Sequence, residues 1–257
     1  MNNIKAKKKY GQNFLKDNFI IQKIIELANP ENQDILEIGP GLGAITIPLL
    51  EKAKSLLAYE IDAELIEILK NKITSSKLEI KNEDFLKADL NFNESKILVA
   101  NLPYYITSDI LFKIFENLSM FSKMVIMVQE EVADRIVAKE KTSNFSKLSL
   151  ACQLVAEVKK ELKILPSSFV PQPKVNSALV TFEFKKNLDQ QNIQEFFSFT
   201  KKCFSMKRKT FYNNLSTFIN EEKIKKIFNH FSLNHKIRPQ EISLENYKQI
   251  FEFFKNL

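Results

Sequence analysis

The sequence is short of several residue types, and each shortage excludes a class of protein. It holds two cysteines, at 152 and 203, and two histidines, at 230 and 235. Because these side chains are few and scattered, we expect neither a disulfide framework nor a metal site. No stretch approaches the roughly 18 consecutive apolar residues of a membrane span, and the basic N-terminus MNNIKAKKKY has no apolar core behind it. We therefore expect a cytoplasmic protein with no secretory signal and no membrane partner.

Glycine is scarcer still, and its distribution indicates a binding loop. A chain of this length would ordinarily hold about 18 glycines, but this one holds four, and three of them lie in LEIGPGLG at residues 36–43. Glycines at this spacing let backbone N–H groups approach a polar or anionic ligand, and a helix N-terminus behind them adds partial positive charge. This loop is the first candidate site.

Arginine is rare too, yet lysine brings the formal net charge to +7. That charge is compatible with nucleic-acid binding. It is equally what an AT-rich genome produces, because asparagine, isoleucine and phenylalanine are abundant as well. The local clusters are more informative than the total, namely KAKKK at 5–9 and KRK at 207–209.

Short β-branched runs alternate with helical patterns and predict an α/β fold. We expect strands at 34–39, 55–62, 77–84, 96–102 and 123–130, with helices between them. This alternation is typical of a parallel sheet covered by helices on both faces. NSALVTFEFK at 176–185 is expected to fold back antiparallel at the sheet edge.

The length suits one large domain and one small one. KKNLDQQN at 185–192 is polar and unpatterned, and the chain beyond it is helical and rich in phenylalanine. We predict a nucleotide-binding domain over 1–187, with a basic N-terminal arm, and a small all-α domain over 188–257. No oligomer interface is evident in the sequence, and we expect a monomer.

The glycine loop and the acid that follows it fit two cofactors. Gly39, Gly41 and Ala44 satisfy the dinucleotide fingerprint, and Glu60, at the end of the second strand, stands about 20 residues on, where a ribose-binding acid belongs. NAD and S-adenosylmethionine enzymes both place an acid there, because a carboxylate can accept from both ribose hydroxyls. An NAD-dependent oxidoreductase and a methyltransferase both remain open at this point.

The ends of the third and fourth strands favour S-adenosylmethionine and an adenine target. Asp84 can accept a hydrogen bond from the cofactor's adenine amino group while Phe85 packs near the ring. The fourth strand ends in the tetrapeptide Asn101-Leu102-Pro103-Tyr104, which NAD chemistry does not explain.

The tetrapeptide suits the polarisation of an adenine N6 nitrogen, whose lone pair is delocalised into the ring. If the Asn101 oxygen and a carbonyl of the Leu102-Pro103 turn accept the two N6 hydrogens, the lone pair localises and can attack a sulfonium methyl in line. Pro103 has no N–H to compete, and Tyr104 is expected to stack on the extruded base.

An ordered set of motifs makes the chain resemble the ribosomal RNA adenine-N6,N6-dimethyltransferases, the KsgA family, which is related to the Erm methyltransferases. The motifs are YGQNFL (10–15), LEIGPGLG (36–43), YEID (59–62), NEDFL (82–86), NLPYYIT (101–107), QEEVADRIVA (129–138), FSKLSLACQ (145–153), PSSFVPQPKVNSALV (166–180) and KRKTFYNNL (207–215). The resemblance implies a Rossmann-like class I methyltransferase sheet with an antiparallel last hairpin, a small helical domain, and S-adenosylmethionine as cofactor.

The resemblance also implies a substrate and residue roles. The substrate would be two adjacent adenosines in the 3′-terminal hairpin of 16S rRNA, dimethylated within the small ribosomal subunit or its precursor during ribosome biogenesis. The cofactor would be bound by Asn13, Leu15, Gly39, Gly41, Glu60, Ile61, Asp84, Phe85 and Asn101. Phe169 would form a second aromatic wall around the target base beside Tyr104, and Lys207, Arg208, Lys209, Arg135 and Lys147 would contact RNA phosphates.

One departure and two alternatives belong with this resemblance. Many family members have Asn-Ile-Ser after NLPY, whereas this chain has Tyr-Ile-Thr at 105–107, a change not expected to touch N6. An Erm-type 23S rRNA methyltransferase is the nearest alternative, although PSSFVPQPKVNSALV and KRKTFYNNL favour the 16S enzyme. A ribosome-assembly factor whose binding outweighs its catalysis is the other.

Overall fold

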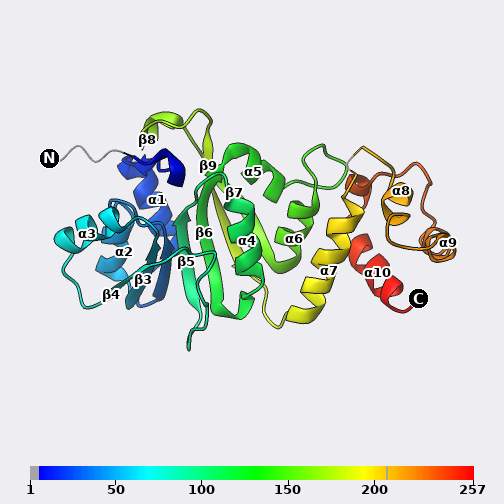
Figure 1. The fold of residues 1–257 in the computed structure, drawn as a ribbon, viewed down its shortest axis with the longest axis horizontal. Coiled ribbons are helices and arrows are strands. Elements are labelled where there is room, and N and C mark those ends of the chain that lie inside the picture. Colours follow the sequence, from blue (N-terminus) through cyan, green and yellow to red (C-terminus); the bar gives the residue numbers. More distant parts are fainter. Residues whose placement is uncertain (1–5, 207) are drawn as a thin grey trace. The chain divides into compact units, whose positions relative to one another are not determined.

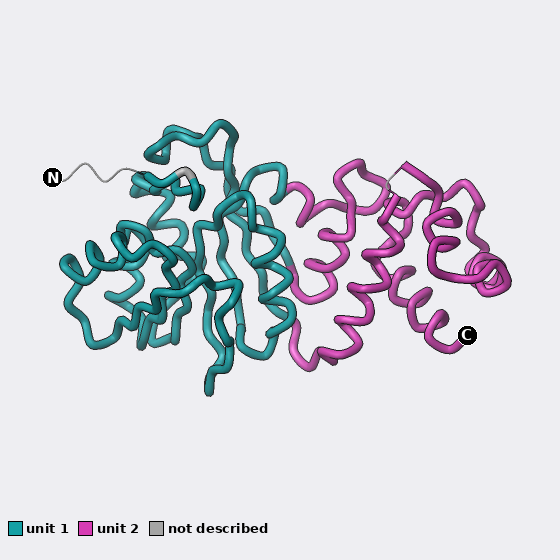
Figure 2. The backbone as a smooth tube through the Cα atoms, viewed as in Figure 1, with its two compact units in different colours: residues 1–133, 158–184 teal, residues 134–157, 185–257 magenta. Residues whose placement is uncertain are grey.

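A computed structural model describes residues 6–206 and 208–257. The chain forms two compact units (Figure 2), the first from residues 1–133 and 158–184 and the second from residues 134–157 and 185–257. Residues 134–157, which the sequence analysis assigned to the first domain, therefore group with the C-terminal helices. Packing explains the difference, because Phe145 and Leu150 belong to the aromatic core of the second unit.

A seven-stranded sheet with the order β4-β3-β2-β5-β6-β9-β7 forms the centre of the first unit (Figure 1). Its strands are β2 (Asp34–Ile38), β3 (Ser55–Glu60), β4 (Leu78–Asn82), β5 (Lys96–Asn101), β6 (Phe121–Gln129), β7 (Ala156–Ile164) and β9 (Ser177–Phe184). Strands β2 to β6 pair in parallel, and β9 pairs antiparallel with β6. The predicted mostly parallel α/β sheet is confirmed.

The position of β9 differs from the expectation. The sequence placed it at the sheet edge, but it lies between β6 and β7, and β7 is the outermost strand. The burial patterns give the reason. The first six residues of β9 are buried, as in a strand covered on both sides, whereas β7 alternates buried or half-buried positions with exposed ones such as Lys159 and Lys163. Exposed charges of this kind suit an edge strand.

Helices and two short strands complete the first unit. The helices are α1 (Asn18–Ala28), α2 (Thr46–Lys52), α3 (Ala63–Lys72), α4 (Thr107–Phe115) and α5 (Glu130–Ile136), the last of which runs into the second unit. Helix α1 begins where the Asp17 carboxylate accepts from the backbone N–H groups of residues 19 and 20, and α3 begins where Asp62 accepts from Glu64. Strand β1 (Phe14–Leu15) pairs antiparallel with β8 (Phe169–Val170), apart from the main sheet.

The second unit is helical and has its own core. It contains α6 (Lys147–Val155), α7 (Gln190–Cys203), α8 (Phe211–Leu215), α9 (Glu221–His230) and α10 (Leu244–Lys255). Phenylalanines fill it, and the Phe199 ring lies 5.5 Å from that of Phe251 and 5.3 Å from that of Phe254. Within the described residues, no helix combines the length and the apolar character that a bilayer span requires.

Candidate active site

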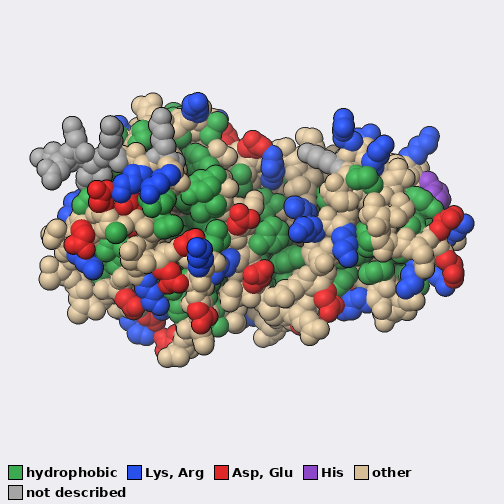
Figure 3. Space-filling view, viewed as in Figure 1, with side chains coloured by type: hydrophobic (Ala, Val, Ile, Leu, Met, Phe, Trp, Pro, Cys, Tyr) green, Lys and Arg blue, Asp and Glu red, His purple; other side chains and the backbone are tan. Residues whose placement is uncertain are grey.

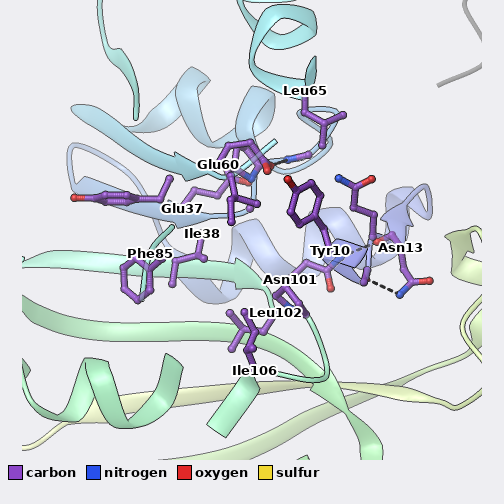
Figure 4. A pocket seen from close by; sticks show the side chains of 18 of the residues that line it. Tyr10, Asn13, Glu37, Ile38, Glu60, Leu65, Phe85, Asn101, Leu102 and Ile106 are labelled. Atoms are coloured by element: carbon purple, nitrogen blue, oxygen red, sulfur yellow. Dashed lines mark hydrogen bonds between the residues drawn. The ribbon is translucent and has the colours of Figure 1, made fainter. Parts of the chain in front are cut away.

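A cavity of about 260 Å³ opens at the carboxyl ends of the parallel strands. Its walls come from the glycine loop after β2, the end of β3, the turn after β4, the end of β5 and the N-terminal segment around residues 10–15. Parallel strands all end at the same edge of the sheet, which is why segments so distant in sequence meet here. Figure 4 shows Glu60, Phe85, Asn101, Tyr10 and Asn13 around this one space.

The structure brings together the residues that were predicted to bind the cofactor and polarise the target. Those lining the cavity are Asn13, Leu15, Gly39, Gly41, Glu60, Ile61, Asp84, Phe85, Asn101, Leu102, Pro103 and Tyr104. Sequence reasoning missed other lining residues, among them Tyr10, Phe14, Glu37, Leu65 and Tyr105.

The glycine loop depends on backbone angles that other residues rarely adopt. Gly39, Gly41 and Gly43 have φ values of 68°, 57° and 84°, in the left-handed region that a Cβ disfavours. A Cβ on Gly41 would also lie 3.3 Å from the Phe14 ring. Glycine at this position therefore allows the loop to turn and the N-terminal segment to pack against it.

Glu60 is a buried carboxylate held by backbone donors. It is 5% exposed, and it accepts hydrogen bonds from the N–H of Asp62 at 2.9 Å and from that of Gly41 at 3.3 Å. Burial raises the pKa of its carboxyl, and the two N–H donors oppose that rise. A carboxylate fixed at the end of β3 can accept hydrogen bonds from vicinal hydroxyls.

The turn after β4 provides a polar group beside an aromatic ring. The Asp84 carboxylate accepts from the backbone N–H of Leu86 at 3.0 Å, which fixes its direction. Phe85 is buried and meets Tyr59 edge to face, with ring centroids 5.6 Å apart. This pairing of acceptor and ring suits an adenine.

Glu37 is a second buried acid in the cavity wall. It lies in β2, is 2% exposed, and its Oε2 has no hydrogen-bond partner among the described residues. Burial raises the pKa of this carboxyl to about 8, and the negative charge of Glu60 acts in the same direction. A buried carboxyl oxygen without a partner fits the cationic part of a ligand. The signal in the sequence was a glutamate inside the otherwise apolar run ILEI.

Replacing Glu37 with glutamine should flatten the pH dependence of stability in the ligand-free protein. The folded-state pKa of about 8 exceeds the reference value of 4.5. The folded protein therefore binds this proton more tightly, and the wild type loses stability as the pH rises from 4.5 through 8. We compare the free energy of unfolding of E37Q with that of the wild type. We expect this difference to shift in favour of E37Q by about a few kcal/mol between pH 5 and pH 9. Urea unfolding at both pH values measures these free energies. If the free energy of unfolding changed equally with pH in both proteins, the result would contradict a neutral Glu37.

Asn101 lies at the end of β5 with its amide orientation fixed. Its Nδ2 donates a hydrogen bond to the backbone carbonyl of Asn13 at 3.0 Å, which leaves the side-chain oxygen as an acceptor. The Pro103 carbonyl already accepts from the Thr107 hydroxyl at 3.1 Å and from the Ile106 N–H at 3.3 Å. The Leu102 carbonyl is therefore the candidate for the second acceptor of the turn.

Tyr104 offers an aromatic ring to the same cavity. Its hydroxyl is hydrogen-bonded to the Ser177 hydroxyl, with the oxygens 2.6 Å apart. Burial raises the pKa of the phenol, so the ring is neutral at physiological pH. Since Ser177 lies at the start of β9, this strand helps to fix the position of the Tyr104 ring, which is expected to stack on the target base.

Phe169 is placed differently from the prediction. It is fully buried in the core of the first unit and is absent from the lining of the cavity. Pairing of β8 with β1 sets Phe169 opposite Leu15, and both side chains belong to the same core cluster. In this structure the ring is a core residue, and its role as a second aromatic wall stays a prediction.

The residues predicted to contact RNA belong to the second unit. Arg135, Lys147, Arg208 and Lys209 are all exposed, and Lys207 lies outside the described residues. The KRK cluster at 207–209 was expected to begin a helix, but Arg208 and Lys209 lie before the first helical residue, Phe211. They precede α8, because the Thr210 side chain caps that helix by accepting from the N–H of Asn213.

The comparisons agree with one another over nearly the whole chain. The family described as "Ribosomal RNA adenine dimethylase" matches residues 3–256. Proteins named "Ribosomal RNA small subunit methyltransferase A" are 54% identical in Mesomycoplasma hyopneumoniae strain J, covering 97% of this chain and 96% of the relative, and 50% identical in Mycoplasma mobile, covering 95% and 96%.

Solved structures give the same result. A dimethyladenosine transferase from Plasmodium falciparum superposes with a TM-score of 0.83 at 26% identity, over 95% of this chain and 98% of its own. The 23S rRNA methyltransferase ErmE superposes with a TM-score of 0.72 at 25% identity, over 95% and 100%. These matches favour the methyltransferase over the NAD-dependent oxidoreductase. Because the family match covers residues 3–256, the chain belongs to the ribosomal RNA adenine dimethylase family.

Proposed function

We propose that this enzyme uses S-adenosylmethionine to dimethylate N6 of two adjacent adenosines in the 3′-terminal hairpin of 16S rRNA, within the small ribosomal subunit or its precursor. The observation that carries the proposal is the fixed amide of Asn101, set in one cavity with the glycine loop and Glu60. The names of the relatives support the small subunit. We propose that the protein acts as a cytoplasmic monomer in ribosome biogenesis.

The cavity fits S-adenosylmethionine on its chemistry. Glu60 would accept from the ribose hydroxyls, and Asp84 from the adenine amino group. Glu37, whose Oε2 has no partner among the described residues, would lose its proton to solvent when the cation binds and would then balance the cofactor's positive charge. Ile61, half exposed at 44%, and the buried Phe85 supply apolar surface. When bound, the cofactor supplies an electrophilic methyl group.

The chain's own part in the reaction is to hold and polarise a nitrogen. The Asn101 oxygen and the Leu102 carbonyl would accept the two N6 hydrogens, drawing the nitrogen toward a tetrahedral shape while Tyr104 holds the base flat. The first methylation leaves one N6 hydrogen, so the second relies on one of these acceptors. Most of the acceleration comes from positioning rather than from a strong base.

Basic side chains of the second unit are proposed to bind RNA phosphates. Lys and Arg side chains are numerous over this unit in Figure 3, and Arg135, Lys147, Arg208 and Lys209 are exposed there. We include Lys207 on sequence grounds. Contacts of this kind are independent of base identity and weaken with salt.

Methyl transfer with the modified site mapped tests the proposal. Labelled S-adenosylmethionine is offered with small-subunit particles that lack the modification and, in parallel, with protein-free 23S rRNA. We expect label on the adjacent adenosines of the 16S hairpin. Label on 23S rRNA alone would favour the Erm-type alternative. Tight subunit binding without any transfer would favour an assembly factor.

A further inference from the structure

We propose that Lys7 and Gln12 are positioning residues that fasten the N-terminal strap, defined as residues 7–15, so that it holds both the cofactor and Asn101. The inference rests on the proposed function of the cavity and extends it to two side chains that the sequence did not single out, of which Gln12 also lines the cavity. The strap contacts Asp62 on the proposed cofactor side of the cavity and Asn101 on the proposed target side.

Two residues of the strap, Lys7 and Gln12, are fastened to Asp62, the residue that caps α3. The Lys7 ammonium donates to one Asp62 oxygen at 2.7 Å and lies 2.6 Å from Glu64, while the Gln12 amide donates to the other Asp62 oxygen at 2.9 Å. The Gln12 oxygen in turn accepts from the backbone N–H of Lys7 at 2.7 Å. Asp62 is only 4% exposed, so the strap satisfies a nearly buried carboxylate.

Asp62 connects this anchor to the proposed ribose site. Its backbone N–H donates to Glu60 at 2.9 Å, so the strap is fastened two residues from the acid that would hold the ribose. Burial alone would raise the pKa of Asp62, but Lys7 and Gln12 hold it below its usual value. The Asp62 carboxylate is therefore charged and available to the strap at physiological pH.

The strap also reaches the turn at residues 101–104. The carbonyl of Asn13, next to Gln12, accepts the 3.0 Å hydrogen bond that orients the Asn101 amide. Gly11, with φ of 62°, packs so closely that an added Cβ would lie 3.2 Å from the Tyr105 ring. If the strap moved away, the Asn101 amide would lose the partner that sets its direction. The cavity would also lose the part of its wall that residues 10–15 form.

Two variants test the strap against a matched control. Lys7→Met and Gln12→Ala each remove one fastening and leave the cavity lining by Asn13 and Asn101 in place. Lys54→Met is the control, because Lys54 also bridges two carboxylates, Asp34 and Glu94, at 3.0 Å each, but at the amino ends of the strands. Lys7→Arg keeps the charge and should restore function.

We expect both strap variants to weaken S-adenosylmethionine binding about tenfold and to lower kcat at saturating cofactor by about tenfold. Calorimetry without RNA measures the first effect, and methyl transfer to small-subunit particles measures the second. Variants that match Lys54→Met in both readouts would overturn the proposal. Weaker binding with an unchanged kcat would also overturn it, because the strap would then cover the cofactor without positioning Asn101. If the wild type transferred no methyl group, the proposed function would fail, while calorimetry would still decide whether the strap is fastened as inferred.

Discussion

Replacing Asn101 with alanine is expected to lower kcat for methyl transfer by a factor of about 10² to 10³. The variant loses the oxygen that would accept an N6 hydrogen, and the Leu102 carbonyl is left as the single acceptor that polarises the nitrogen. Binding of small-subunit particles should persist, because the basic residues proposed to contact RNA belong to the other unit. Single-turnover methyl transfer at saturating cofactor and RNA measures the loss.

Two further variants separate chemistry from structure. Asn117→Ala is the matched control, because the Asn117 amide also donates to a backbone carbonyl, that of Lys113 at 2.9 Å, but outside the cavity. Asn101→Asp keeps an acceptor and removes the donor to Asn13, so we expect a loss smaller than that of Asn101→Ala. A kcat for Asn101→Ala within a few-fold of the control would exclude the amide as the polarising group.

The cofactor half of the site could be predicted because its positions follow from topology. Once alternating strands and helices indicate a parallel sheet, residues that end neighbouring strands must meet at one edge. The glycine loop, Glu60, Asp84 and Asn101 each end or directly follow a strand, and the structure places all of them around one cavity. Local pattern and global fold agree at these positions, which is why sequence reasoning sufficed.

The N-terminal segment could not be predicted, because its contacts are remote in sequence. Asn13 and Asn101 are 88 residues apart, and Gln12 and Asp62 are 50 apart. No periodicity in YGQNFL indicates such partners, and the sequence by itself is compatible with a plain loop before the first helix. The resemblance supplied Asn13 and Leu15, but not Phe14, whose ring packs against Gly41.

Burial decided the remaining differences. A phenylalanine in a proline-rich loop is compatible with a core position and with a binding wall, and only the pairing of β8 with β1 places Phe169 in the core. Glu37 shows the opposite case, because a strand that reads as core contains an acid that lines the cavity. In both cases the deciding contacts come from other strands.

Replacing Glu60 with glutamine is expected to weaken S-adenosylmethionine binding by a factor of about 10 to 100. Each oxygen of the carboxylate accepts a backbone N–H, from Asp62 and from Gly41. A glutamine amide can accept at one of these positions only, and its NH₂ group would face an N–H donor at the other. The variant therefore loses the charge that would bind the ribose and disturbs the glycine loop as well. Calorimetry without RNA measures the affinity.

Asp34→Asn is the matched control for Glu60, because it neutralises another hydrogen-bonded carboxylate at the opposite end of the same sheet. Its affinity for the cofactor should equal that of the wild type. At saturating cofactor, Glu60→Gln should recover most of the wild-type kcat, since Glu60 would hold the ribose and not the reacting nitrogen, whereas Asn101→Ala should not recover. This difference in kcat would assign Glu60 to cofactor binding and Asn101 to the chemical step. If Glu60→Gln bound the cofactor as tightly as Asp34→Asn, the Glu60 carboxylate would not be part of the ribose site.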